Sequence, residues 1–243
     1  MALTWAHLLT VLNAGALFFS LALIGVSPAT GYFTGHGMRL VNEAYPRGYY
    51  EWYRGPSYDM DTRHFVKVVY ESTNEYMIFT AAAVGGVAGV IGVVGFFLTL
   101  KQSKPTTRKS TLYLLVLPGF VTFIVTLITF TFSQVIHNTD NKGQCYWEHG
   151  YIPNNVFVCT RELAACNIAG YFRKDDDKLA MLYDTLQRTC GATQTGRHLV
   201  APLFVASVLM FAFSVAKLVV EKRQSVFIET ADERVDRLTR QEE

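Results

Sequence analysis

The sequence predicts an all-α integral membrane protein, a four-transmembrane-helix bundle with a disulfide-stabilised, partly helical second outer loop. Three observations lead to this prediction: four long apolar windows, a basic connector between the middle two windows, and four cysteines that all follow the third window. The composition agrees, because 50% of the 243 residues are hydrophobic and only 17% are charged. The mean hydropathy of +0.19 indicates apolar spans that alternate with polar segments.

Each window is long enough to cross a hydrocarbon core about 30 Å thick, which takes roughly 20 helical residues. The windows contain no charged residue before Lys217. The second window is rich in glycine, which costs about 1 kcal/mol relative to alanine in a water-exposed helix but lets helices approach closely in a membrane. The predicted transmembrane helices are residues 1–27, 76–100, 112–136 and 199–220.

The first window also partly fits a secretory signal, since Ser27, Pro28 and Ala29 loosely match a small-residue cleavage site. The preceding segment, MALTWAH, lacks the basic residues of a signal peptide, and the apolar run is long for one. We therefore expect residues 1–27 to be a retained helix.

The connector between the second and third spans predicts the orientation. Its sequence, KQSKPTTRKS, holds four basic residues and no acidic one. Short connectors with this bias face the cytoplasm, so both termini are expected there, in the plasma membrane or the secretory pathway. The expected segments are outer loop 1 at 28–75, the cytoplasmic link at 101–111, outer loop 2 at 137–198 and a cytoplasmic tail at 221–243.

All four cysteines lie in outer loop 2, at Cys145, Cys159, Cys166 and Cys190. Clustered thiols on the non-cytosolic side of a membrane predict two disulfides. The alternative is a zinc site that uses Cys145 and His149 with the later cysteines. Because the chain has no CxxC or HxxxH spacing, disulfides are favoured and no metal is expected.

Helical spacing on both sides of Lys174 predicts a helical hairpin, which suggests how the cysteines pair. On one helix Cys159 and Cys166 would lie about 10 Å apart, beyond the limit of about 7 Å between the Cα atoms of a disulfide. An antiparallel hairpin would bring Cys159 beside Cys190 and leave Cys145 for Cys166. The alternative pairs Cys145 with Cys159 and Cys166 with Cys190.

Two rows of residues indicate close packing between spans. A small-residue seam on the second span, which would let a neighbouring backbone approach, consists of Ala81, Gly85, Ala88, Gly89, Gly92 and Gly95. A hydroxyl row on the third span consists of Thr122, Thr126, Thr129 and Ser133. The hydroxyl row either bonds between helices or lines a water-filled path, and the lack of charged residues in the middle of the spans favours bonding.

Outer loop 1 contains an aromatic and basic stretch, AYPRGYYEWYRGPSY. Aromatic and arginine side chains stack on sugar rings and dominate protein interfaces, but they also form belts at the membrane surface. Both readings stay open at this point. The residues proposed for partner contact are Tyr49, Tyr50, Trp52, Tyr53 and Arg54.

Motifs of enzymes are missing from the sequence. It has no phosphate-binding loop, no GxSxG and no HExxH. The one acidic run, at residues 175–177, lacks the spaced ligands of a calcium loop and is better placed to begin a helix. We therefore expect no catalytic residue and no cofactor, and the net charge of +2 gives no reason to expect a nucleic-acid partner.

Four spans, inner termini and a larger cysteine-bearing second loop resemble the layout of the tetraspanins, and Asn13 is similar to the polar residue of their first span. The claudin-like group, with its fungal members, also has four spans. The resemblance covers the span pattern and implies no site residues.

The predicted function is that of a non-enzymatic tetraspan protein that organises partners laterally through its helices and outer loops. Its expected partners are the lipid bilayer and other membrane proteins or a second copy of itself. The alternative function is a channel or transport subunit with a threonine-lined path.

Overall fold

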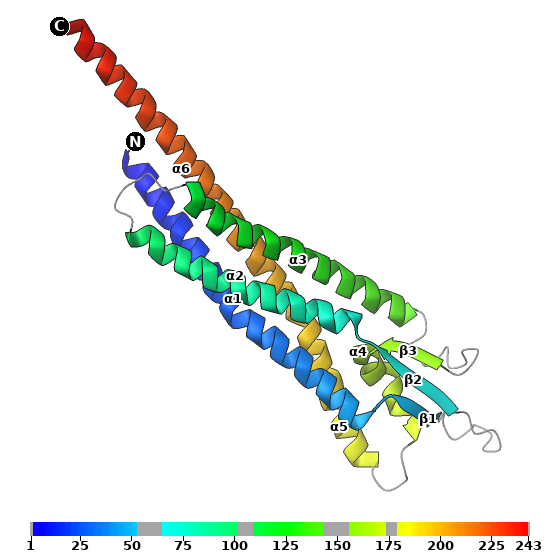
Figure 1. Cartoon of the computed structure of the whole chain (residues 1–243). Helices are drawn as coiled ribbons and strands as arrows, with labels where there is room; N and C mark the ends of the chain where they lie inside the picture. The colour runs from blue at the N-terminus through cyan, green and yellow to red at the C-terminus, as the bar shows by residue number, and fades with distance from the viewer. Residues whose placement is uncertain (1, 53–64, 102–108, 143–155, 174–178, 243) are drawn as a thin grey trace. The chain divides into compact units, whose positions relative to one another are not determined.

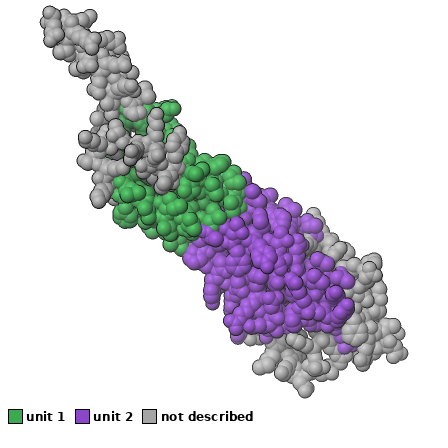
Figure 2. Space-filling view, viewed as in Figure 1, with its two compact units in different colours: residues 1–25, 84–125, 203–243 green, residues 26–83, 126–202 purple. Residues whose placement is uncertain are grey.

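The computed structural model describes residues 2–52, 65–101, 109–142, 156–173 and 179–242. The chain divides into two compact units (Figure 2). Unit 1 consists of 1–25, 84–125 and 203–243, and unit 2 consists of 26–83 and 126–202. Four long helices contribute residues to both units (Figure 1): α1 (Ala2–Ala44), α2 (Thr73–Lys101), α3 (Lys109–Lys142) and α6 (Val200–Glu242).

Within the described part of the chain, four helical segments are long and apolar enough to cross a membrane. This confirms the prediction of four such helices. Their bounds, which include or overlap the predicted spans, are His7–Ala44, Thr73–Thr99, Val116–Thr139 and Thr185–Gln224.

Helix α1 does not end at Ser27, where its predicted span ended, but continues through Pro28 to Ala44. The apolar run ends near Ser27, yet a helical face continues, with buried residues at Thr30, Thr34 and Val41. Val41 belongs to the core of unit 2, and Thr30 and Thr34 are buried along the same helix. The end of a hydrophobic window is therefore not the end of this helix.

Unit 2 contains a four-stranded sheet, so the prediction of an all-α protein is wrong for this part of the chain. The strands are β1 (Gly48–Trp52), β2 (Phe65–Glu71), β3 (Val156–Thr160) and β4 (Phe172–Arg173). Their order is β3-β2-β1-β4, and β2 runs parallel to β3 but antiparallel to β1, which is also antiparallel to β4. The sheet thus joins both expected outer loops (Figure 1).

Strand β2 shows why this sheet forms. In its sequence FVKVVYE, Val66, Val68 and Tyr70 are buried, while Lys67 between them is exposed. This alternation, together with β-branched and aromatic residues, is typical of a half-buried strand. On the neighbouring strand β3, Phe157 lies opposite Val68 and joins the same core.

The core of unit 2 also contains two tyrosines. The hydroxyl of Tyr70 donates a hydrogen bond to the carbonyl oxygen of Tyr45 at 2.6 Å. Burial raises the pKa of Tyr45 to about 12 and raises the pKa of Tyr70 as well. Burial therefore disfavours the charged phenolate form of both side chains.

The segment after Cys159 is not the first helix of a hairpin. Cys159 lies on β3 with its side chain fully buried in the core. Short helical turns follow: α4 (Arg161–Leu163), the π-helical η2 (Ala164–Ile168) and η3 (Ala169–Tyr171). Lys174 and the acidic run at 175–177 lie outside the described residues.

One disulfide of unit 2 joins Cys166, on η2, to Cys190, on α5 (Leu179–His198). The predicted pairing of Cys159 with Cys190 and Cys145 with Cys166 is therefore wrong. The hairpin register assumed that Cys159 begins a helix, whereas the strand directs it into the core and leaves Cys166 to face α5. Cys159 is itself disulfide-bonded, and Cys145 lies outside the described residues.

Removing this disulfide should destabilise unit 2. Its half-cystines are 24 residues apart, and a crosslink that closes a loop of this size is worth about 3 kcal/mol in the chain-entropy model. We expect the variant with Cys166→Ser and Cys190→Ser to unfold at lower temperature in detergent, as monitored by tryptophan fluorescence. Peptide mapping without reductant should recover Cys166 linked to Cys190 from the unaltered protein. A peptide that links Cys159 to Cys190 would contradict this prediction.

Candidate functional site

The small-residue seam lies on the inner side of α2, where all six of its residues are buried. A Cβ atom added to Gly89 would lie 2.8 Å from the carbonyl oxygen of Ser20 and 2.9 Å from Cγ1 of Ile24. At this point α1 approaches α2 so closely that any side chain on residue 89 would displace it. Other sides of α2 expose large apolar side chains, among them Val87, Val90 and Val94.

The hydroxyl row on α3 is buried at all four of its positions. The Thr122 hydroxyl donates to the carbonyl oxygen of Pro118 at 2.8 Å, which adds a donor where the proline interrupts the helix. The Thr129 hydroxyl donates to the carbonyl oxygen of Met77, on α2, at 3.3 Å. At these two positions the row bonds to backbone acceptors.

The structure describes the aromatic stretch of outer loop 1 as far as Trp52. Tyr49 is 71% exposed, and the ammonium group of Lys67 lies 5.8 Å from the centre of its ring. The hydroxyl of Tyr50 donates to the carbonyl oxygen of Pro46, so this side chain turns back toward the residues that precede its strand. Trp52 ends β1, whereas Tyr53 and Arg54 lie outside the described residues.

A buried polar network of unit 2 surrounds two residues that the sequence pattern did not point to, Arg161 and Glu162. They directly follow β3, and the hydroxyl oxygen of Thr160 accepts a hydrogen bond from the backbone N–H of Leu163 at 3.4 Å. This cap starts the turn of α4 at the end of the strand. Both charged side chains are consequently carried into the interior, where both are buried.

Arg161 joins helices α1 and α2 to the end of the sheet. Its Nη1 lies 3.0 Å from Oε1 of Glu75, and its Nε donates to Oδ1 of Asn42 at 3.2 Å. Nη1 also donates to the hydroxyl of Ser72 at 3.1 Å, and the guanidinium lies 5.3 Å from the centre of the Tyr70 ring. We call these five residues the Arg161 cluster.

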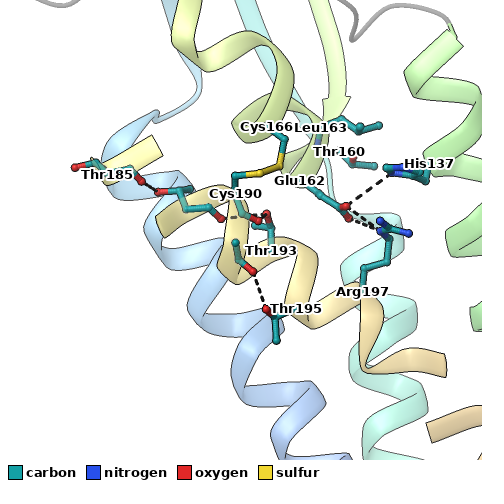
Figure 3. The surroundings of a disulfide bond; sticks show 12 residues. His137, Thr160, Glu162, Leu163, Cys166, Thr185, Cys190, Thr193, Thr195 and Arg197 are labelled. Carbon is teal, nitrogen blue, oxygen red and sulfur yellow. Dashed lines mark hydrogen bonds and ion pairs between the residues drawn. A yellow bond between two sulfur atoms is a disulfide. The ribbon is translucent and has the colours of Figure 1, made fainter. Parts of the chain in front are cut away.

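The carboxylate of Glu162 contacts Arg197 of α5 (Figure 3). Nε of Arg197 donates to its two carboxylate oxygens at 2.8 and 2.9 Å. Nδ1 of His137, near the end of α3, lies 3.8 Å from Oε1 of Glu162. Adjacent residues of one turn thus hold four different helices of unit 2, since Arg161 contacts α1 and α2 while Glu162 contacts α5 and α3.

These ion pairs link helix ends of unit 2. Both oxygens of Glu162 accept hydrogen bonds from Arg197. No group of three or more His, Cys, Asp or Glu side chains in the described ranges is placed to hold a metal ion. The arrangement can fix the positions of helix ends.

A sequence signal for this cluster exists. Arg161 and Glu162 interrupt an otherwise apolar stretch, VFVCTRELAAC. In a surface helix such a charged pair is unremarkable, but directly after a buried strand it indicates buried ion pairs. The helical spacing of the segment predicted a helix and so concealed this signal.

Comparison with known proteins found no match: no protein-family model, curated protein or solved structure matches this chain. The layout that the structure shows consists of four helices long and apolar enough to span a membrane. The resemblance to tetraspanins and the claudin-like group extends to that layout alone.

Proposed function

We propose that this chain is a non-enzymatic integral membrane protein that presents a rigid outer domain and organises neighbouring membrane proteins laterally. The observation that carries the proposal is the distribution of side chains on the long helices. Large apolar side chains are exposed, for example Phe18 at 65% and Leu117 at 63%. Hydroxyl side chains are buried, among them Ser20, Thr126 and Ser207.

This distribution is the reverse of that in a water-soluble helical bundle. In water, an apolar surface of this extent would drive association. In lipid, apolar side chains face the acyl chains at no cost, and small or hydroxyl residues pack the helices together. The proposal therefore places the four long helices in a bilayer, with the basic link on the cytoplasmic side and the disulfide of unit 2 on the oxidising side.

The crosslinks within unit 2 support the proposed role of a rigid scaffold. Four of its helices are joined through adjacent residues of α4, as described above, and the disulfide joins η2 to α5. Such crosslinks raise the free energy of local opening. A domain held in this way presents a constant surface, and its exposed Tyr49 beside Lys67 is the first contact that we would test.

A channel or transport subunit is the second candidate, because a buried row of four hydroxyls is also a feature of polar paths through membranes. The two functions predict different results for one substitution. Thr126→Val keeps the shape of the side chain and removes its hydroxyl. It should leave a scaffold's interactions intact but alter the ion selectivity or conductance of a channel.

The decisive experiment combines proximity labelling with reconstitution. A labelling enzyme fused to the C-terminal tail should mark a reproducible set of membrane proteins, absent with a matched four-span control, and Tyr49→Ala should deplete part of that set. Purified protein in liposomes should show no selective ion flux. A selective flux that Thr126→Val changes, or a labelled set equal to that of the control, would overturn the proposal.

A further inference from the structure

A small cavity of unit 2 lies beside the Arg161 cluster. The space open to the centre of a water molecule is about 20 Å³, and about 10–15 Å³ is enough to hold one water. The walls come from α1, α2, the end of β3 with α4, and α5. The lining residues include Thr34, Asn74, Glu75, Thr160, Glu162 and Arg197.

Three of the lining residues each have a buried polar atom without a hydrogen-bond partner in the structure: Oγ1 of Thr34, Oδ1 of Asn74 and Oε2 of Glu75. Their residues are only 6%, 7% and 8% exposed, respectively. A buried polar atom that makes no hydrogen bond costs about 1–3 kcal/mol. Three such atoms around one cavity therefore indicate a bound species that pairs with them.

Other polar groups at the cavity are already engaged. Oε1 of Glu75 pairs with Arg161, and the carboxylate of Glu162 pairs with Arg197. The hydroxyl of Thr193 donates to backbone carbonyl oxygens of its own helix. The bound species has to satisfy the three remaining atoms, two of which are pure acceptors when the Glu75 carboxylate is ionised.

We propose that the cavity binds a single water molecule that donates hydrogen bonds to Asn74 and Glu75 and accepts one from the hydroxyl of Thr34. This matches the hydrogen-bonding capacity of water and the approximately three bonds that a buried water typically makes. The water would bridge α1 and α2 directly beside the ion pair of Glu75 with Arg161. This inference does not depend on the proposed function.

The charges around the cavity favour water over a metal cation. Two carboxylates, Glu75 and Glu162, face two guanidinium groups, Arg161 and Arg197. These charges cancel, so no net negative charge is left to offset the cost of dehydrating a cation. Three oxygen atoms also fall short of the six to eight ligands of calcium or the octahedral shell of magnesium.

The test is a high-resolution map of the full-length protein in lipid nanodiscs, together with a pair of threonine variants. We expect one density peak within hydrogen-bond distance of all three atoms. Thr34→Val should remove this peak and lower the unfolding temperature. Thr195→Val, which removes an exposed hydroxyl that donates to its own helix, should retain the peak and unfold close to the unaltered protein.

A salt comparison separates water from a cation. The unfolding temperature should be the same in sodium chloride and in choline chloride of equal ionic strength. A stabilisation specific to sodium that is lost in Glu75→Gln would overturn the proposal in favour of a cation site. A map of the unaltered protein without density in the cavity would overturn it directly, even if Thr34→Val fails to fold.

Discussion

Replacing Arg161 with methionine should lower the free energy of unfolding by about 3–5 kcal/mol, the usual cost of removing one partner of a buried ion pair. The carboxylate of Glu75 would stay buried without its cation, and Asn42 would lose the donor that lies 3.2 Å away. The measurement is unfolding in detergent micelles, monitored by tryptophan fluorescence.

The matched control is Arg39→Met. Arg39 pairs with Glu43 on the same helix at 2.6 Å, but their side chains are 77% and 58% exposed. Exposed pairs of this kind are worth about 0.2–1 kcal/mol, so this variant should unfold almost like the unaltered protein. Equal effects of the two substitutions would show that burial does not decide the importance of Arg161.

A second substitution distinguishes the loss of the ion pair itself from the cost of leaving the Glu75 carboxylate buried without a counter-charge. Glu75→Gln in the Arg161→Met background removes the uncompensated carboxylate and should restore a substantial part of the lost stability. When both partners of a buried ion pair are replaced, the protein is often no less stable than the original. If the double variant is as unstable as Arg161→Met alone, the cost comes from packing or from the hydrogen bonds to Asn42 and Ser72.

The second large effect is expected for Gly89→Leu on the small-residue seam. With the carbonyl oxygen of Ser20 on α1 already 2.8 Å from the position of an added Cβ, a leucine must push α1 and α2 apart. Overpacking costs about 1–3 kcal/mol where neighbouring side chains can adjust, and here a helix backbone has to move. We expect a loss of about 3 kcal/mol or failure to fold, measured by size-exclusion chromatography and thermal unfolding.

Gly25→Leu is the control for this substitution. An added Cβ at Gly25 meets no atom within 4 Å, so the larger side chain has room. Replacing glycine inside a helix also raises helix propensity. We therefore expect Gly25→Leu to be neutral or stabilising. An unchanged elution profile and unfolding temperature for Gly89→Leu would show that the seam tolerates a side chain and is no tight interface.

The sequence predicted the helices far better than the outer segments. A membrane-length helix needs a long apolar run, which can be read from consecutive residues such as 76–100. The spacing of the seam likewise follows from one helix period. The alternation of side chains along β2 is typical of a strand. Nothing within β2, however, shows that β3 would be its parallel neighbour. The sheet and the disulfide pairing were missed for this reason.

Local chemistry therefore determined four apolar helices, their small-residue and hydroxyl faces, and a cysteine-rich outer segment, because each depends on residues that are neighbours along the chain. The tertiary structure decided which of these features meet. Arg161 reaches Glu75 across 86 residues and Asn42 across 119, and Cys166 faces Cys190 because Cys159 is held in the core by a strand. Such partners are chosen by how whole elements pack, since a buried charge is stable only where the fold supplies its counter-charge.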